Sequence, residues 1–96
     1  MSGPSPTIVL YGKPGCGLCD EARTILDDLL AERVASGRPT APVEERNILT
    51  DEAWEREFFE EIPVVEVGQR RLALAASAAR LRQLLAETLD GAQIAP

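Results

Sequence analysis

The chain has 96 residues, of which 45% are hydrophobic and 27% charged, a composition typical of one small folded domain. Its formal net charge is −6 and its basic residues form no run, which argues against nucleic acid and against an anionic membrane surface as partners. No apolar stretch approaches the roughly 20 residues that span a bilayer, and the first residues lack the pattern of a signal peptide, so we expect a cytoplasmic protein.

The first half of the chain predicts a strand, a turn and a long helix. Residues 1–6 contain mainly Ser, Gly and Pro, so we expect a short disordered lead. The apolar run Thr7–Tyr11 predicts a strand that is buried on both faces and parallel to a neighbour. Residues 12–15 predict a turn, and from Gly17 to about Ser36 apolar residues recur at helical spacing. The residues expected on the apolar face of this helix are Leu18, Ala22, Ile25, Leu26, Leu29, Leu30 and Val34.

The middle of the chain predicts a weaker strand and a short helix. The strand covers Val43–Asn47, and its charged residues indicate the edge of a sheet. A helix is expected to start near Thr50, and Trp54 and Phe58, four residues apart, lie on one face of it.

The last third predicts a β-hairpin and a closing helix. Residues 62–67 and 70–74 form the two strands of the hairpin. Ser77 can cap a helix that runs to about residue 90, and we expect residues 91–96 to be a frayed tail.

These elements predict an α/β fold with one domain over residues 7–90. A right-handed crossover makes the first two strands parallel, and the hairpin adds an antiparallel pair. The expected architecture is a four-stranded mixed sheet flanked by helices.

Cys16 and Cys19 are the only cysteines, and they stand where the first strand turns into the long helix. A thiolate at a helix N-terminus is stabilised by unpaired backbone N–H groups and by the helix dipole. Cys16 is therefore the expected nucleophile, and Cys19, one turn further in, can attack a mixed disulfide held on Cys16. The chain has no histidine, which argues against cysteine-protease chemistry.

Two other interpretations of the cysteine pair stay open. The cysteines can be two small buried residues with no chemistry. Alternatively, they can hold a metal, although a closed zinc site needs four ligands and would require a second chain or added carboxylates. The alternative function is thus a non-enzymatic binding module. In one form of this alternative, the Cys16–Cys19 pair binds a metal.

With this order of elements, the chain resembles the glutaredoxin-like branch of the thioredoxin superfamily from about Thr7 to Leu89. Two stretches carry the resemblance, namely Leu10–Ala22, with its Cys-Gly-Leu-Cys-Asp-Glu-Ala sequence, and Ile62–Gly68. The first stretch is particularly similar to small bacterial glutaredoxin-like proteins in which a Cys-x-Leu-Cys-Asp sequence opens the helix.

The resemblance implies roles for five residues. Cys16 is the attacking thiol and Cys19 the resolving thiol, while Pro63 matches the family's cis-proline, which faces the dithiol. The backbone of Ile62 is expected to pair with an extended substrate, and Lys13 to lie near a glutathione carboxylate. Without the resemblance, a proline that enters an edge strand needs no function, and Lys13 is a solvated turn residue.

The chain departs from glutaredoxins at two places. It has Gly17-Leu18 where glutaredoxins usually have an aromatic residue between the cysteines. Residues 75–78, Ala-Ala-Ser-Ala, replace the Gly-Gly turn and polar pair that hold the γ-glutamyl end of glutathione, although Ser77 at a helix start can still hold a carboxylate.

We therefore predict a monomeric thiol-disulfide oxidoreductase that acts on protein disulfides or on glutathione mixed disulfides. It requires no organic cofactor, and glutathione is a candidate reductant or co-substrate.

Overall fold

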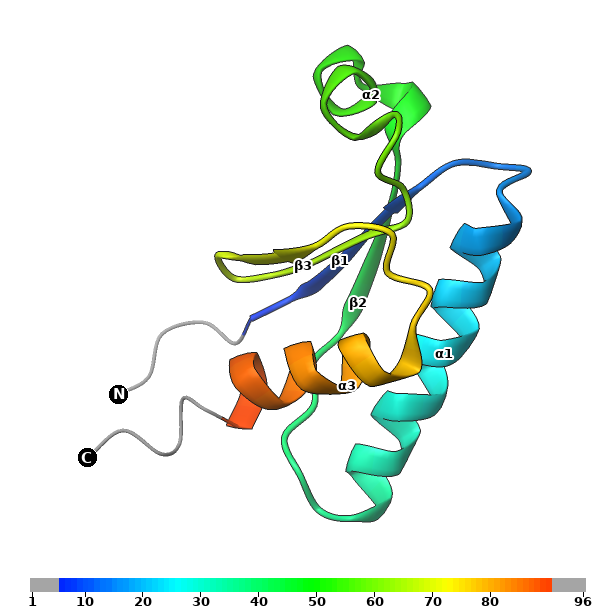
Figure 1. The fold of residues 1–96 in the computed structure, drawn as a ribbon. Helices are drawn as coiled ribbons and strands as arrows, with labels where there is room; N and C mark the ends of the chain where they lie inside the picture. The colour runs from blue at the N-terminus through cyan, green and yellow to red at the C-terminus, as the bar shows by residue number, and fades with distance from the viewer. Residues whose placement is uncertain (1–5, 91–96) are drawn as a thin grey trace.

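The computed structural model describes residues 6–90 (Figure 1). The predicted tail, and the predicted lead apart from Pro6, lie outside the described residues. In chain order the strands and helices are β1 (Ile8–Gly12), α1 (Gly17–Ala35), β2 (Val43–Asn47), α2 (Glu52–Phe58), β3 (Val64–Val67), β4 (Arg70–Leu72) and α3 (Ala78–Leu85). A 3₁₀ turn, Ile48–Thr50, precedes α2, and a π-helical segment, Ala86–Asp90, extends α3.

The four strands form one mixed sheet in the order β2-β1-β3-β4. β1 is parallel to β2, with Gly12 opposite Asn47, and antiparallel to β3, with Tyr11 opposite Val64. The predicted α/β class, the central position of β1 and the edge position of β2 are confirmed. Pro63 does not enter an edge strand, because β3 lies between β1 and β4.

The larger core lies on the sheet face that α1 and α3 cover, and these two helices pack against each other (Figure 1). Alternate residues of each strand point into it, as the two-residue period of a strand requires. Its fully buried side chains include Ile8, Leu26, Val65 and Leu81. Ser77 caps α3 as predicted, because its hydroxyl accepts the amide N–H of Arg80 at 3.3 Å.

A second, smaller core lies on the opposite face, beneath α2. Tyr11 packs between Trp54 and Phe58, with ring centroids 5.7 Å and 4.4 Å away. Two arginines cover these aromatic rings from outside: Arg46 lies 5.3 Å from the centroid of Trp54 and Arg71 lies 4.9 Å from that of Phe58. Each guanidinium attracts the negative face of a ring while its charged end stays near water.

The apolar face predicted for the first helix is wrong at both ends. Leu18 and Val34 are exposed, whereas Arg33 is buried. The Arg33 guanidinium donates to the backbone carbonyl of Pro39 at 2.6 Å and pairs with the carboxylate of Asp90, beyond α3. The spacing of apolar residues predicted Val34 as the buried residue at this end of the helix. Arg33 is buried instead, because its long side chain carries several donors that find acceptors.

Two further differences concern segment ends. The hairpin strands are shorter than predicted, with β3 starting at Val64 and β4 ending at Leu72.

Between residues 6 and 90, no helix is long and apolar enough to cross a membrane.

The Arg33 interaction can be tested by replacing it with an apolar side chain of similar length. Arg33→Met leaves the Pro39 carbonyl and the Asp90 carboxylate without their donor, so we expect the free energy of unfolding to fall by about 2 kcal/mol. The matched control is Arg82→Met, because the Arg82–Glu32 pair, at 2.9 Å, is exposed and should contribute less than about 1 kcal/mol. Urea unfolding measures both variants, and equal stability of the two would contradict this role of Arg33.

Candidate functional site

The loop between β1 and α1 positions Cys16. β1 ends at Gly12, and Gly15 adopts a left-handed conformation, with φ 78°, that turns the chain back towards the sheet. Cys16 then occupies the N-cap position of α1 in an extended conformation, and its Sγ accepts the backbone N–H of Cys19 at 3.1 Å. The sulfur thus takes the place of the side-chain oxygen that usually caps a helix.

The two cysteines are joined in a disulfide, with their Cα atoms 5.2 Å apart. Cys16 is half-buried, whereas Cys19 is only 7% exposed. Of the two cysteines, Cys16 is therefore the more exposed residue.

Gly12 allows the Cys19 sulfur to lie directly against the end of β1. A Cβ atom at position 12 would meet Cys19 Sγ at 3.0 Å and Cys19 Cβ at 3.2 Å, closer than side chains normally pack. The sequence predicted only a turn at Gly12, because its spacing from Cys19 gives no sign of the contact.

The structure places Pro63 across from Gly12, the residue on which Cys19 packs. The Ile62–Pro63 peptide bond is cis, as the family resemblance implies. Tyr11 lies opposite Val64, so one step further along the two strands Pro63 lies opposite Gly12, on which Cys19 packs. Pro63 is fully buried, and its carbonyl accepts the amide N–H of Ala75 at 2.8 Å.

The backbone of Ile62 is only partly free to pair with an extended substrate. Its N–H donates to the carbonyl of Phe58 at 3.1 Å. Within the described part of the chain, no backbone N–H donates to the Ile62 carbonyl, so this oxygen is the group that can accept a bond from a substrate strand. The binding role of Ile62 stays a prediction, and the structure leaves its carbonyl as the backbone group for that role.

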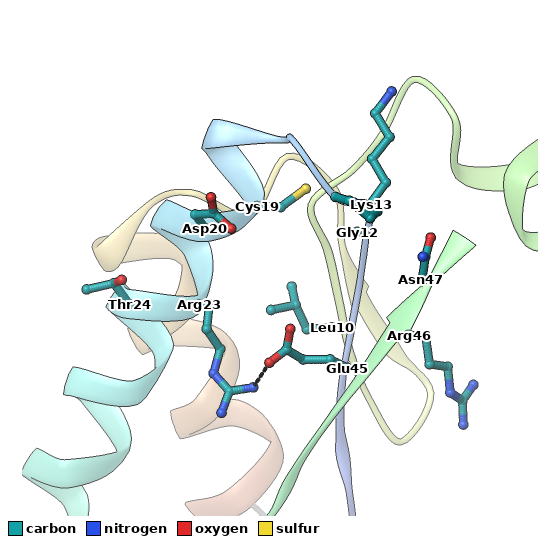
Figure 2. A pocket seen from close by; sticks show the side chains of 11 residues that line it. Leu10, Gly12, Lys13, Cys19, Asp20, Arg23, Thr24, Glu45, Arg46 and Asn47 are labelled. Atoms are coloured by element: carbon teal, nitrogen blue, oxygen red, sulfur yellow. Dashed lines mark hydrogen bonds and ion pairs between the residues drawn. The ribbon is translucent and has the colours of Figure 1, made fainter. Parts of the chain in front are cut away.

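Lys13 is exposed, and its ammonium lies 5.7 Å from the centroid of the Phe59 ring. Figure 2 shows Lys13 among the residues that line a pocket beside Cys19, with the end of its side chain pointing away from Cys19. The structure thus places Lys13 in the loop before the dithiol, and its role in binding stays a prediction.

A pocket of about 540 Å³ lies beside the buried sulfur, between the first turns of α1 and the end of β2 (Figure 2). Arg23 of α1 and Glu45 of β2 form an ion pair of 2.5 Å across it. On the other side of β2, the hydrogen bond to Glu44 raises the pKa of the Arg46 guanidinium above its ordinary value. Sequence reasoning missed this pocket, since its walls come from residues with no shared motif. They are Leu10, Gly12, Lys13, Pro14, Cys19, Asp20, Arg23, Thr24, Glu45, Arg46 and Asn47.

Within residues 6–90, no group of three or more His, Cys, Asp or Glu side chains forms a cluster that could hold a metal ion. The cysteine pair is thus accompanied by neither a histidine nor a gathered set of carboxylates. The chemistry of the site centres on two sulfurs.

A disulfide-bonded cysteine pair at the start of the first helix, together with a cis-proline before β3 in a four-stranded mixed sheet, defines a small domain of the thioredoxin-like class. The model of the glutaredoxin-like domain family (DUF836) matches residues 7–95, and the chain belongs to this family. The resemblance predicted from the sequence is confirmed.

Two solved structures share the fold. The structural-genomics target protein XcR50 from X. campestris is 28% identical, with a TM-score of 0.65, and the match covers 93% of this chain and 99% of that one. A structure described as that of a malarial protein is 15% identical, with a TM-score of 0.63, and the match covers 90% of this chain and 99% of that one. No match was found among curated proteins.

The contact between Gly12 and Cys19 can be tested by adding one methyl group. Gly12→Ala should push Cys19 away from β1 and lower the free energy of unfolding of the disulfide form by about 1–2 kcal/mol. Gly17→Ala is the matched control, because a Cβ at position 17 meets no atom within 4 Å. Urea unfolding of both oxidised variants makes the comparison, and a Gly12→Ala protein as stable as Gly17→Ala would refute the packing argument.

Proposed function

We propose that the protein is a thiol-disulfide oxidoreductase in which Cys16 is the nucleophile and Cys19 the resolving thiol. The observation that carries this proposal is the capping of α1 by the Cys16 sulfur, which accepts the N–H of Cys19, in a residue that is more exposed than Cys19. A backbone donor aimed at a sulfur favours its charged form, and the charged thiolate is the form that attacks disulfides.

The proposed cycle uses two exchange steps. The Cys16 thiolate attacks one sulfur of a substrate disulfide, and the other substrate sulfur leaves as a thiolate that takes up a proton. The Cys19 thiolate then attacks Cys16, forming the Cys16–Cys19 disulfide and releasing the second substrate sulfur as a thiol. Two molecules of an external thiol, with glutathione as a candidate, then return the two electrons; they leave joined as a disulfide, and the Cys16–Cys19 dithiol is restored.

Two other predicted residues have binding roles in this proposed reaction. The position of Pro63 across from Gly12 and its cis peptide bond support a place for it next to a bound substrate, and the Ile62 carbonyl can accept a hydrogen bond from a substrate backbone. We propose that the protein acts in the cytoplasm, as a monomer and without an organic cofactor.

Single-cysteine variants test the roles of the two sulfurs. In reduction of bis(2-hydroxyethyl) disulfide with glutathione as reductant, Cys16→Ser should reduce turnover to the uncatalysed rate, because the attacking sulfur is absent. Cys19→Ser should accumulate a mixed disulfide on Cys16, detected by intact mass after acid quench. Both variants lose the same disulfide, so a difference between them reports the order of attack and not a common loss of stability.

A redox titration of the wild-type protein in glutathione buffers completes this test. Alkylation and mass measurement should count the dithiol, the internal disulfide and the glutathione adduct separately. Full activity in both single-cysteine variants, or a pair that stays reduced across the titration, would overturn the oxidoreductase proposal in favour of a binding module.

A further inference from the structure

Exposed apolar side chains gather at the dithiol end of the molecule. Five large hydrophobic residues between positions 6 and 90 are exposed. Three of them come from segments that border the dithiol, namely Leu18, Phe59 and Leu74, with exposed fractions of 53%, 57% and 53%. Leu49, just beyond the end of β2, lies at the same end of the sheet, and only Val34 lies at the far end of α1. Exposed apolar groups gathered in one place indicate a contact surface.

Each of the three residues is tied to the dithiol by a specific connection. Leu18 lies between the two cysteines. Phe59 carries the Lys13 ammonium over its ring, and Lys13 belongs to the loop that leads to Cys16. The amide of Leu74 donates to the carbonyl of Glu61 at 2.9 Å, which holds Leu74 beside the segment that contains Pro63. We refer to Leu18, Phe59 and Leu74 as the apolar rim.

Leu74 holds its exposed position in an unfavourable backbone conformation. Its φ is 50°, in the left-handed region. Among the described residues other than glycine, Leu74 alone has a positive φ. A glycine would adopt this conformation without the steric cost of a Cβ. Neither burial nor backbone preference therefore accounts for a leucine at this place.

The charges around the apolar rim are mainly negative. Asp20 and Glu21 follow Cys19, Glu60 and Glu61 follow Phe59, and all four are exposed. None of these four forms an ion pair with another described residue. The unpaired cations of the same segments are Lys13 and Arg56, so the surface keeps an excess of negative charge. Such a surface attracts a cationic partner and repels an anionic one.

We propose that the substrate disulfide belongs to a polypeptide segment with apolar and basic side chains near its cysteine, and that this segment is preferred over glutathione. Glutathione has two carboxylates and one ammonium group, so its net charge has the same sign as the surface. An apolar and basic segment matches both features of the surface. This inference rests on the proposed redox function and names the class of substrate on which that function acts.

The reaction on such a segment is the exchange described above. The Cys16 thiolate bonds to the cysteine sulfur of the segment, and the former partner of that sulfur leaves with a proton. Cys19 then displaces the segment as a thiol, so two electrons pass from the dithiol to the substrate disulfide. The apolar rim contributes while the segment is attached to Cys16.

The test uses reduced protein in a single turnover with four disulfides. Two are peptides whose one cysteine is joined to 2-mercaptoethanol and flanked by Leu and Phe, with Lys in one peptide and Glu in the other. The third is glutathione disulfide, and the fourth is bis(2-hydroxyethyl) disulfide, which is neutral and has no side chains. Formation of the Cys16–Cys19 disulfide is followed by alkylation and mass, and each rate is divided by the rate of dithiothreitol with the same compound.

For the wild-type protein, we expect the normalised rate to be about tenfold higher with the basic peptide than with the acidic peptide or glutathione disulfide. Phe59→Ser and Leu74→Gly should each lower the rate with the basic peptide about three- to tenfold and leave the neutral disulfide unchanged. Leu74→Gly also relieves the positive φ, and an unchanged rate with the neutral disulfide would show that a loss of rate with the basic peptide does not come from unfolding. Val34→Ser, at a residue that is 64% exposed, is the matched control and should change neither rate.

Equal normalised rates with all four disulfides, a faster reaction with glutathione disulfide, or equal effects of Val34→Ser and Leu74→Gly would overturn the substrate proposal alone. A wild-type protein that reacts with none of the four, the neutral disulfide included, would overturn the oxidoreductase function and the substrate proposal with it.

Discussion

The contact between the Cys19 sulfur and the backbone of Gly12 is the constraint on which the dithiol end of the molecule depends. β1 lies between β2 and β3, so its last residues meet the end of β2 on one side and the start of β3 on the other. Because Gly12 has no side chain, the first turn of α1 can approach the end of β1 closely. That approach sets Cys16 at the N-cap of α1, and the strand register sets Pro63 across from Gly12.

Arginine side chains complete the cores on the two faces of the sheet in different ways. On the α1 and α3 face, Arg33 is buried, and a carbonyl and a carboxylate receive its donors. On the α2 face, Arg46 and Arg71 stay at the surface and lie over aromatic rings. Hydrogen bonds to Glu66 and Glu57 raise the pKa of the Arg71 guanidinium, so this cation stays charged while it covers Phe58. A small domain with few aromatic residues thus extends its second core with the stems of arginines.

The sequence could predict the fold because each element has a local signal, whereas several parts of the site have none. The apolar run of β1, the spacing in α1 and Ser77 at the start of α3 each act within one segment. The burial of Arg33 depends on Pro39 and Asp90, which lie 6 and 57 residues away in the chain, so the helical period alone placed Val34 inside instead. The Gly12 contact and the pocket beside Cys19 likewise arise only when β1, β2 and α1 come together.

The fold gives the two sulfurs different surroundings, through hydrogen bonding and burial. The Cys16 sulfur accepts a backbone N–H and is half-exposed, so charge on it meets both a hydrogen-bond donor and water. The Cys19 sulfur is buried against Gly12, so charge on it would lose hydration. The chain contains no histidine, and the charged residues next to the cysteines are Lys13 in the preceding loop and Asp20 in the first turn of α1. It follows that a change in the position of α1 relative to β1 would affect the reactivity of both sulfurs at once, although it alters no charged group.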